Sequence, residues 1–235
     1  MRKHIVAIHQ PNFFPWLGYF DKIRRADTFI VLDNVQFPKT GGSWTNRVVI
    51  LQNDSTGWLT APIERNYHGT RSINEMQFAA TDWRKTLLRQ LEAAYRKAPH
   101  RAETFALITP LLMNLEQNVA EYNIHAVTQL CAALGLTTLF VRSSSLEVAA
   151  SATERLIALT KAVNGTHYLS GGGAQGYQQD AAFAEAGIGL TYQQFVPQPY
   201  PQTPGNAFFA GLSIIDALMF LGREALCLYY AQQLR

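Results

Sequence analysis

Two polar residues near the N-terminus have the side chains of general acid–base catalysis at positions that suit a binding site. His9 follows the apolar run of residues 5–8, and Asp33 follows a second apolar run at residues 29–32. An imidazole titrates near neutral pH, so His9 is the better candidate for a general base or acid, and Asp33 could orient it or act itself. If both runs are strands, these residues lie beyond the strand ends, where open α/β sheets bind ligands. We therefore predict His9 and Asp33 as catalytic residues.

Charged and aromatic side chains in the same stretch suit the binding of an anionic small molecule. Lys39 and Arg47 match a phosphate, diphosphate or carboxylate, because both donate hydrogen bonds and carry positive charge. Trp16, Tyr19 and Trp44 offer flat faces for a sugar or a base, although such aromatics more often pack in a core. The predicted substrate-binding residues are Gln10, Trp16, Tyr19, Gln36, Lys39, Asn46, Arg47, Ser170, Gly171, Gly172, Tyr177, Tyr200 and Gln202.

A glycine-rich segment, SGGGAQGY at residues 170–177, follows a short apolar run at residues 167–169. It matches neither GxGxxG nor GxxxxGK[ST], the patterns of the named nucleotide loops. Glycines after a strand still let a ligand approach the backbone closely, and they leave amides available to an anion or a carbonyl. A flexible connector is the alternative interpretation, and the flanking Ser170 and Tyr177 favour the binding role.

Other kinds of catalysis lack their residue patterns. The histidines show no HxH or HExxH spacing, so we expect no metal site. There is no GxSxG motif, and Cys131 and Cys227 lie in apolar helical patterns, where a reactive thiolate is disfavoured. What remains fits group transfer by positioning and electrostatics. No motif identifies a cofactor.

The composition is that of a globular protein without a nucleic-acid or membrane partner. The 235 residues are 48% hydrophobic and 16% charged, with a net charge of +3 and no cluster of lysines and arginines. The longest apolar run, around residues 207–221, is interrupted by Gly211, Ser213 and Asp216, so it is too short and too polar to span a bilayer. The N-terminus has no signal-peptide pattern, and the two cysteines suit a reducing cytosol. We expect a cytoplasmic protein.

Hydrophobic periodicity predicts a single α/β domain over residues 1–235, with a mostly parallel central sheet flanked by helices. A strand, a helix and a second strand open the chain as a βαβ-like unit, whose strands should be parallel. An antiparallel excursion is predicted near residues 47–63, and a helical section at residues 82–135. The predicted strands are residues 4–9, 28–32, 47–51, 57–63, 137–141, 167–169 and 190–195.

Two local features of the predicted helices are specific enough to test. Ser151 and Glu154 match a capping box, in which the serine accepts from the amide three residues on and the glutamate reaches back. The closing helix, residues 212–233, is predicted to run through Gly222.

Several motifs, in order along nearly the whole chain, resemble the WbqC-like protein family. IHQPNFFPWLGYFDKI, LDNVQFPK and WTNR resemble its opening, and THYLSGGGAQGY resembles its Tyr-Leu-Ser-Gly stretch. PYPQ followed by LSIIDALMFLG resembles its closing motif. The family pattern has a histidine before the Pro-x-Tyr-Pro-Gln stretch, where this chain has Gln198. An acid or base role at that position would be missing here.

The resemblance implies a role in surface polysaccharide (O-antigen) or related metabolism, because family members are often encoded among such genes. With the residues above, it leads to the hypothesis of a cytoplasmic enzyme that transfers an acyl or aminoacyl group. Its substrate would be an anionic small molecule such as a nucleotide-linked amino sugar, with an acyl donor. The alternative is a non-catalytic ligand-binding or assembly protein of the same pathway. The sequence leaves the oligomeric state open.

In outline, the strand–turn–helix–strand opening is also similar to nucleotidylyltransferases and pantoate-activating ligases. Those enzymes carry an HxGH-type signature after the first strand, whereas this chain has NFFP at residues 12–15. A nucleotide-binding adenylylating enzyme is therefore a third hypothesis, supported by analogy of fold alone.

Overall fold

The computed structural model describes residues 3–52, 55–80, 82–172, 179–202 and 208–232. The chain separates into two compact units, each assembled from segments that are discontinuous in sequence. Unit 1 comprises residues 1–10, 18–34 and 136–196, and unit 2 comprises residues 11–17, 35–135 and 197–235. The single domain expected over residues 1–235 stays a prediction.

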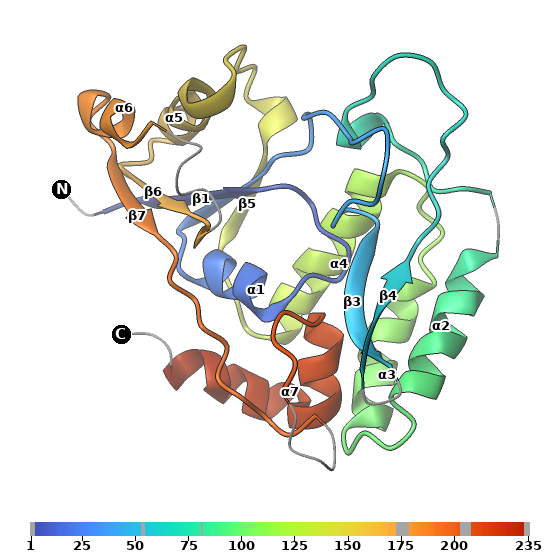
Figure 1. The fold of residues 1–235 in the computed structure, drawn as a ribbon. Coiled ribbons are helices and arrows are strands. Elements are labelled where there is room, and N and C mark those ends of the chain that lie inside the picture. The colour runs from blue at the N-terminus through green and yellow to red at the C-terminus, as the bar shows by residue number, and fades with distance from the viewer. Residues whose placement is uncertain (1–2, 53–54, 81, 173–178, 203–207, 233–235) are drawn as a thin grey trace. The chain divides into compact units, whose positions relative to one another are not determined.

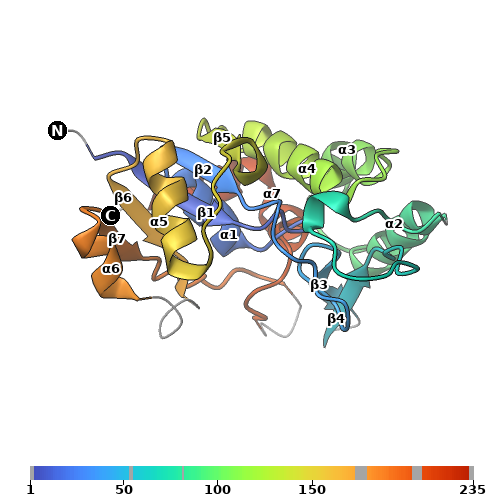
Figure 2. The same ribbon diagram turned by 90° about the horizontal axis from the view of Figure 1, so that it is seen from above.

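The described residues of unit 1 form a five-stranded sheet in which all neighbouring strands are parallel. The strands are β1 (Ile5–His9), β2 (Thr28–Val31), β5 (Leu139–Arg142), β6 (His167–Ser170) and β7 (Gly189–Tyr192). Their order across the sheet is β5-β2-β1-β6-β7, so β1 lies at the centre (Figure 2). The chain first builds outward from β1 on one side and then on the other, which is a doubly wound arrangement.

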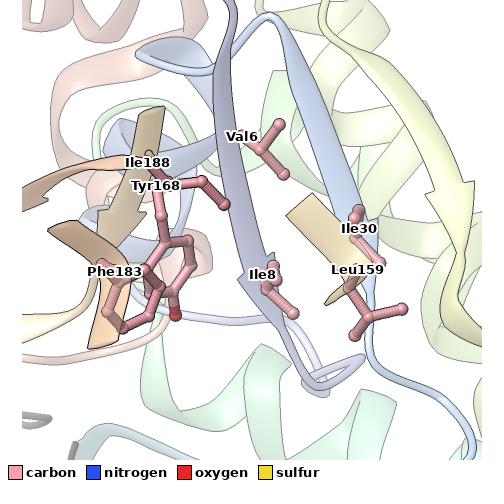
Figure 3. Packing of buried hydrophobic residues seen from close by; sticks show 7 residues of the cluster. All are labelled: Val6, Ile8, Ile30, Leu159, Tyr168, Phe183 and Ile188. Carbon is pink, nitrogen blue, oxygen red and sulfur yellow. The ribbon is translucent and has the colours of Figure 1, made fainter. Parts of the chain in front are cut away.

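Helices cover both faces of this sheet. α1 (Leu17–Arg24) lies on one face, and α5 (Ala152–Ala162) and α6 (Asp180–Glu185) lie on the other (Figure 1). Val6 and Ile8 of β1 point to the same face, where they pack with Leu159 of α5 (Figure 3). On the opposite face the ring of Phe29 lies 5.4 Å from the ring of Tyr19 in α1. The short apolar runs thus form strands that are buried on both faces.

Unit 2 contains an antiparallel hairpin and the helical section. The hairpin consists of β3 (Arg47–Gln52) and β4 (Ser55–Thr60). The helices are α2 (Trp83–Ala94), α3 (Arg101–Leu112), α4 (Val119–Ala133) and α7 (Ile214–Gln232), with a short 3₁₀ helix at Ile73–Glu75. α2 packs beside β4, and α3 packs beside α7 (Figure 1). Asn118 caps α4, because its side-chain oxygen accepts from the amides of Ala120 and Glu121.

Helix α7 is not the continuous helix that the sequence predicted. At Gly222 the backbone has φ 76° and ψ 167°, which divides α7 into two helical segments across a kink. The His100 ring fills the space beside this glycine, and an added Cβ would lie 2.5 Å from its Nδ1. A side chain at residue 222 is thus disfavoured by the backbone conformation and by the neighbouring ring.

The capping box predicted at Ser151 and Glu154 is also wrong. Ser151 precedes α5 but makes no side-chain hydrogen bond to the helix. The next residue, Ala152, has a positive φ of 48°, so the chain enters the helix by a different path. A capping box forms instead between Ser72, the N-cap of the 3₁₀ helix, and Glu75, its last residue.

The predicted fold class is confirmed: a parallel sheet flanked by helices, an antiparallel hairpin and a helical section. The predicted parallel pairing of the first two strands is confirmed by the register of β1 and β2. No helix in the described part of the chain is long and apolar enough to cross a membrane.

Candidate functional site

The carboxyl ends of the parallel strands meet along one edge of the unit 1 sheet, here called the carboxyl edge. The strands β2 and β5 lie on one side of β1, and β6 and β7 lie on the other. Pairing between β1 and β6 ends at Ala7 and Leu169, whereas β1 stays paired with β2 as far as His9 and Val31. The strands β1 and β6 therefore separate at the carboxyl edge. This is the switch point, where the chain builds outward to opposite sides, and doubly wound sheets bind ligands there.

Lys22 of α1 reaches this switch point. Its Nζ donates a hydrogen bond of 2.8 Å to the carbonyl oxygen of Ile8, just beyond the last paired residue of β1 on the β6 side. The residue is only 3% exposed, and burial lowers the pKa of its ammonium to about 7. A Cβ added to Gly171, the residue after β6, would lie 3.9 Å from Nζ. Lys22 thus lies between the ends of β1 and β6. The Ile8 carbonyl is the one acceptor that the described residues offer to an ammonium with three donors.

His9 lies at the same edge with a defined tautomer. Its Nδ1 is 3.1 Å from the carbonyl oxygen of Gln10. Because a carbonyl only accepts, Nδ1 carries the proton and Nε2 keeps its lone pair. The ring packs edge-on against Tyr19, with 4.9 Å between centroids, and the Tyr19 hydroxyl donates to the same Gln10 carbonyl. Burial, and then the positive charge of Lys22, lower the pKa of His9 to about 3. His9 is therefore neutral near pH 7, and its Nε2 has the form of a base.

Asp33 is buried among serines of the turn that follows β5. Its carboxylate accepts from the hydroxyls of Ser143 and Ser144, at 3.0 and 2.7 Å, and from the amide of Ser144 at 3.0 Å. These bonds tie the end of β2 to the end of β5. The hydrogen bond that orients His9 goes to the Gln10 carbonyl and not to Asp33. A catalytic role of Asp33 stays a prediction. Its hydrogen-bond partners are those of a residue that connects two strand ends.

The start of the glycine-rich segment lies at the carboxyl edge, because β6 ends at Ser170. Ser170 is fully buried and hydrogen-bonds to Tyr168. Gly171 is half-buried and Gly172 is exposed. A Cβ at Gly172 would approach the carbonyl oxygen of Gln193 to 3.1 Å, a tight contact, so the two backbone segments lie close together here. Tyr177 lies outside the described residues.

In unit 2, Tyr200 and Gln202 converge on Asp216 in the first turn of α7. The Tyr200 hydroxyl and the Gln202 amide nitrogen each donate to its Oδ1 at 2.7 Å, and the Tyr95 hydroxyl donates to its Oδ2 at 3.1 Å. We call these four residues the Asp216 cluster. Burial raises the pKa of Asp216 to about 6, although the three donors oppose that change. The cluster connects the PYPQ and LSIIDAL motifs in one buried network.

Asn46 and Arg47 lie at the start of β3 and differ in how they are used. Asn46 is buried, and its amide accepts from the Ser43 backbone at 3.1 Å and donates to the Ala61 carbonyl at 2.9 Å. It therefore shapes the loop before β3. The guanidinium of Arg47 stacks on the ring of Trp58, 4.1 Å from its centroid.

The predicted site residues divide between the two units. In unit 2, Lys39 and Gln36 are exposed, and Gln36 and Trp16 form isolated backbone bridges with Ser72 and Ser213. The predicted residues in unit 1 are His9, Gln10, Tyr19, Asp33, Ser170, Gly171 and Gly172. Those in unit 2 are Trp16, Gln36, Lys39, Asn46, Arg47, Tyr200 and Gln202.

Sequence reasoning did not select Lys22 or Asp216, two of the buried charged residues. Lys22 lies three residues from Tyr19 and one from Ile23, both buried on α1. Asp216 interrupts the longest apolar run of the chain. A charged residue inside an apolar helical pattern is the signal that could have identified both, because charged side chains are seldom fully buried unless they are paired.

The groups at the carboxyl edge suit an anion better than a metal cation. An ammonium attracts negative charge, and the imidazole is a single nitrogen ligand. Within the described ranges, no three His, Cys, Asp or Glu side chains lie together in a way that could hold a metal ion.

Comparisons with known proteins agree with the motifs. A sequence model of the WbqC-like protein family matches residues 10–227. The chain is 34% identical over 222 residues to "Uncharacterized protein Rv1507c" of Mycobacterium tuberculosis, across 94% of this chain and 95% of that protein. No solved structure gives a significant match. The resemblance seen in the motifs is confirmed, and the chain belongs to the WbqC-like protein family.

Proposed function

We propose that the protein is a group-transfer enzyme that moves an acyl or aminoacyl group at the carboxyl edge of unit 1. The observation that carries this proposal is Lys22. Its ammonium is buried beside the separating ends of β1 and β6, and no carboxylate in the described part of the chain pairs with it. Burying a charge without a counter-ion costs free energy, so such a residue is typical of a site that a ligand completes.

The groups at this edge supply the steps of acyl transfer. His9 Nε2 takes the proton of an acceptor amine or hydroxyl as that nitrogen or oxygen bonds to the acyl carbonyl carbon. The carbonyl electron pair moves onto its oxygen, and the Lys22 ammonium neutralises the negative charge that develops there. When the carbonyl re-forms, the bond to the leaving group breaks, and the proton held by His9 passes to that group.

The pKa shifts of Lys22 and His9 fit a site in which a bound anionic substrate changes the pKa of both groups. At about 7, the pKa of Lys22 leaves the ammonium only partly protonated at neutral pH. An anion bound beside it favours the protonated form and raises that pKa. The same anion offsets the positive charge that helps to depress the pKa of His9, which makes His9 a stronger base. An anionic substrate therefore improves both groups.

The substrate class follows from the unpaired ammonium together with the family. In this proposal the acceptor is an anionic small molecule of surface-polysaccharide metabolism, such as a nucleotide-linked amino sugar. The alternative, a binding or assembly protein of the same pathway, is favoured by one observation. The pKa of His9, which burial lowers to about 3, is that of a weak base.

The test combines ligand binding with a search for product. The protein is mixed with acyl-CoAs or activated amino acids and with nucleotide-linked amino sugars. Melting temperature and product mass are then measured. A ligand at a hundred times its Kd adds about 2.7 kcal/mol, or about 5–10 °C for a chain of this size. We expect Lys22→Met to abolish both the shift and the transfer, and His9→Gln to keep the shift but lose the transfer.

The matched control is Lys85→Met, a change at an exposed lysine of α2 paired with Asp82. It should behave as the wild-type protein does. A ligand that shifts the melting temperature but is recovered chemically unchanged would favour the binding protein. Transfer that survives Lys22→Met would remove the carboxyl edge as the site.

A further inference from the structure

The β3–β4 hairpin of unit 2 and the loop before it expose a pair of tryptophans. Trp44, just before β3, is 48% exposed, and Trp58 in β4 is 45% exposed. Their ring centroids lie 5.3 Å apart and the ring planes are inclined by 55°. Two large aromatic rings exposed side by side give up hydrophobic burial, and grouped apolar surface of this kind marks a binding site.

Arg47 completes this surface with a fixed cation. Its guanidinium lies 4.1 Å from the centroid of Trp58, so the stacking sets the plane of the group. The guanidinium also lies against Gly42, where it occupies the space that a Cβ on residue 42 would fill. Among the ion pairs of the described residues, none involves Arg47. A stacked guanidinium with unpaired donors has the geometry that binds phosphate oxygens in pairs.

Two more cationic residues are part of the loop of residues 39–42 or contact it: Lys39 lies in the loop, and Arg65 binds its backbone. Arg65 donates to the carbonyl oxygens of Lys39 and Gly41, at 2.7 and 2.8 Å, and so holds the loop in place. The side chain of Lys39 is exposed. Neither Lys39 nor Arg65 has a carboxylate partner among the ion pairs of the described residues. The aromatic pair therefore adjoins a loop whose charge is positive and unbalanced.

We propose that Trp44, Trp58 and Arg47 bind a small molecule in which a ring adjoins a phosphate, as in a nucleotide or a sugar phosphate. The exposed face of Trp44 stacks on the base or on the apolar face of the sugar. The guanidinium of Arg47 binds the phosphate oxygens, and the Lys39 ammonium adds positive charge. The site uses residues of unit 2 alone, so it does not depend on the proposed transfer at the carboxyl edge.

A stacked arginine can also be purely structural, and the chain offers one for comparison. Arg101 lies 5.4 Å from the ring of Phe105 in α3, without an exposed tryptophan pair. Arg101→Ala is therefore the matched control: it removes a stacked arginine of unit 2 from another surface. Arg47→Lys keeps the charge but removes the planar fork, and Trp44→Ala removes the stacking face while leaving Arg47 in place.

The experiment is a calorimetric titration of the full chain with uridine monophosphate, glucose 1-phosphate, uridine and inorganic phosphate, supported by tryptophan fluorescence. We expect one or both phosphorylated rings to bind at least about tenfold more tightly than uridine or phosphate alone. The two phosphorylated ligands distinguish a nucleotide from a sugar phosphate. We expect Arg47→Lys and Trp44→Ala each to weaken that binding by about tenfold or more, and Arg101→Ala to leave it unchanged.

Thermal unfolding first verifies that each variant is folded, which the exposure of Trp44 and the retained positive charge in Arg47→Lys favour. Binding of neither phosphorylated ring would overturn the proposal. So would equal binding by the wild-type protein and both folded variants. A proportionate loss in Arg101→Ala would do so too, because it would show that any surface arginine contributes through net charge.

Discussion

Lys22 and Asp216 are both buried charged residues, and they differ in the partners that the chain gives them. Asp216, in unit 2, accepts from Tyr95, Tyr200 and Gln202. Lys22, in unit 1, donates to the single carbonyl of Ile8. A buried polar group is either paired or costly. Within the described residues, Asp216 thus has three hydrogen-bond donors around its carboxylate, whereas the Lys22 ammonium has one neutral carbonyl acceptor and no carboxylate partner.

The pKa shifts of the two residues agree with this difference. Burial raises the pKa of Asp216 to about 6 and lowers that of Lys22 to about 7, so each is driven towards its neutral form. Three hydrogen bonds to the carboxylate of Asp216 oppose the change. For Lys22, burial is the cause of the shift, and the one hydrogen bond that the ammonium donates to the Ile8 carbonyl does not offset it. The two residues are similarly buried and differ in the number of their hydrogen-bond partners.

The largest effect is expected from Asp216→Ala, which removes the residue with more hydrogen-bond partners. The substitution leaves three buried donors without their acceptor, and we expect it to lower the free energy of unfolding by about 3–5 kcal/mol. Denaturant titration measures the loss. Asp216→Asn keeps an acceptor oxygen in place and should cost less. A loss below about 1 kcal/mol in Asp216→Ala would mean that the Asp216 cluster contributes little to the fold.

Lys22→Met should have the opposite sign. Methionine fills much of the volume of the lysine stem and removes a charge that burial disfavours. The Ile8 carbonyl loses its hydrogen bond, which offsets part of the gain. We expect the variant to be more stable than the wild-type protein by about 2 kcal/mol at pH 7. Gained stability with lost ligand binding would be the pattern of a functional residue.

The stability gain of Lys22→Met should depend on pH. The pKa of Lys22 is about 7 in the folded protein, and that of lysine in an unfolded chain is about 10.4. Between these values the unfolded state binds more protons, so the wild-type stability rises with pH. The advantage of Lys22→Met should therefore shrink by about 2 kcal/mol between pH 7.5 and 9.5. A difference that is constant over this range would show that Lys22 titrates as an exposed lysine does.

The fold was predictable where the signal is local. Strands buried on both faces read as short apolar runs, so the strand predicted at residues 28–32 is found at Thr28–Val31. The kink at Gly222 was not predictable, because it depends on His100, a residue distant in sequence that fills the space beside the glycine. The failed capping box depends on the backbone conformation of Ala152, which the Ser-x-x-Glu pattern does not report.

The candidate site was predictable in the same partial way. His9 was selected because a histidine after a buried apolar run is visible in sequence; its position at the end of β1 is confirmed, and its catalytic role stays a prediction. The partners of Asp33 were not, because Ser143 and Ser144 come 110 and 111 residues later and meet it through strand order alone. Lys22 was missed because its role follows from the end of pairing between β1 and β6, which no local pattern records.

The smallest change in the free energy of unfolding is expected from Tyr95→Phe. This substitution tests whether the hydrogen bonds to Asp216 set its pKa. The Tyr95 hydroxyl donates to Asp216 at 3.1 Å and accepts from the amide of Leu51 at 3.2 Å. The substitution keeps the buried ring and should cost about 1 kcal/mol, measured by denaturant titration at pH 7. It removes one of three bonds that favour the carboxylate, so the pKa of Asp216 should rise further.

A rise in the pKa of Asp216 should change how the free energy of unfolding depends on pH. The pKa of Asp216 is raised in the folded state, from 3.8 to about 6, so between these values the folded protein binds more protons than the unfolded chain. The contribution of Asp216 to stability therefore falls as pH rises through this window. In Tyr95→Phe the fall should extend to higher pH, which makes the variant lose more at pH 7 than at pH 4.5. In an Asp216→Asn background, Tyr95→Phe should cost the same at both. If Tyr95→Phe lowered the free energy of unfolding equally at pH 7 and pH 4.5 with Asp216 present, the hydrogen bond from Tyr95 would not affect the pKa of Asp216. The number of hydrogen-bond partners would then not distinguish Asp216 from Lys22.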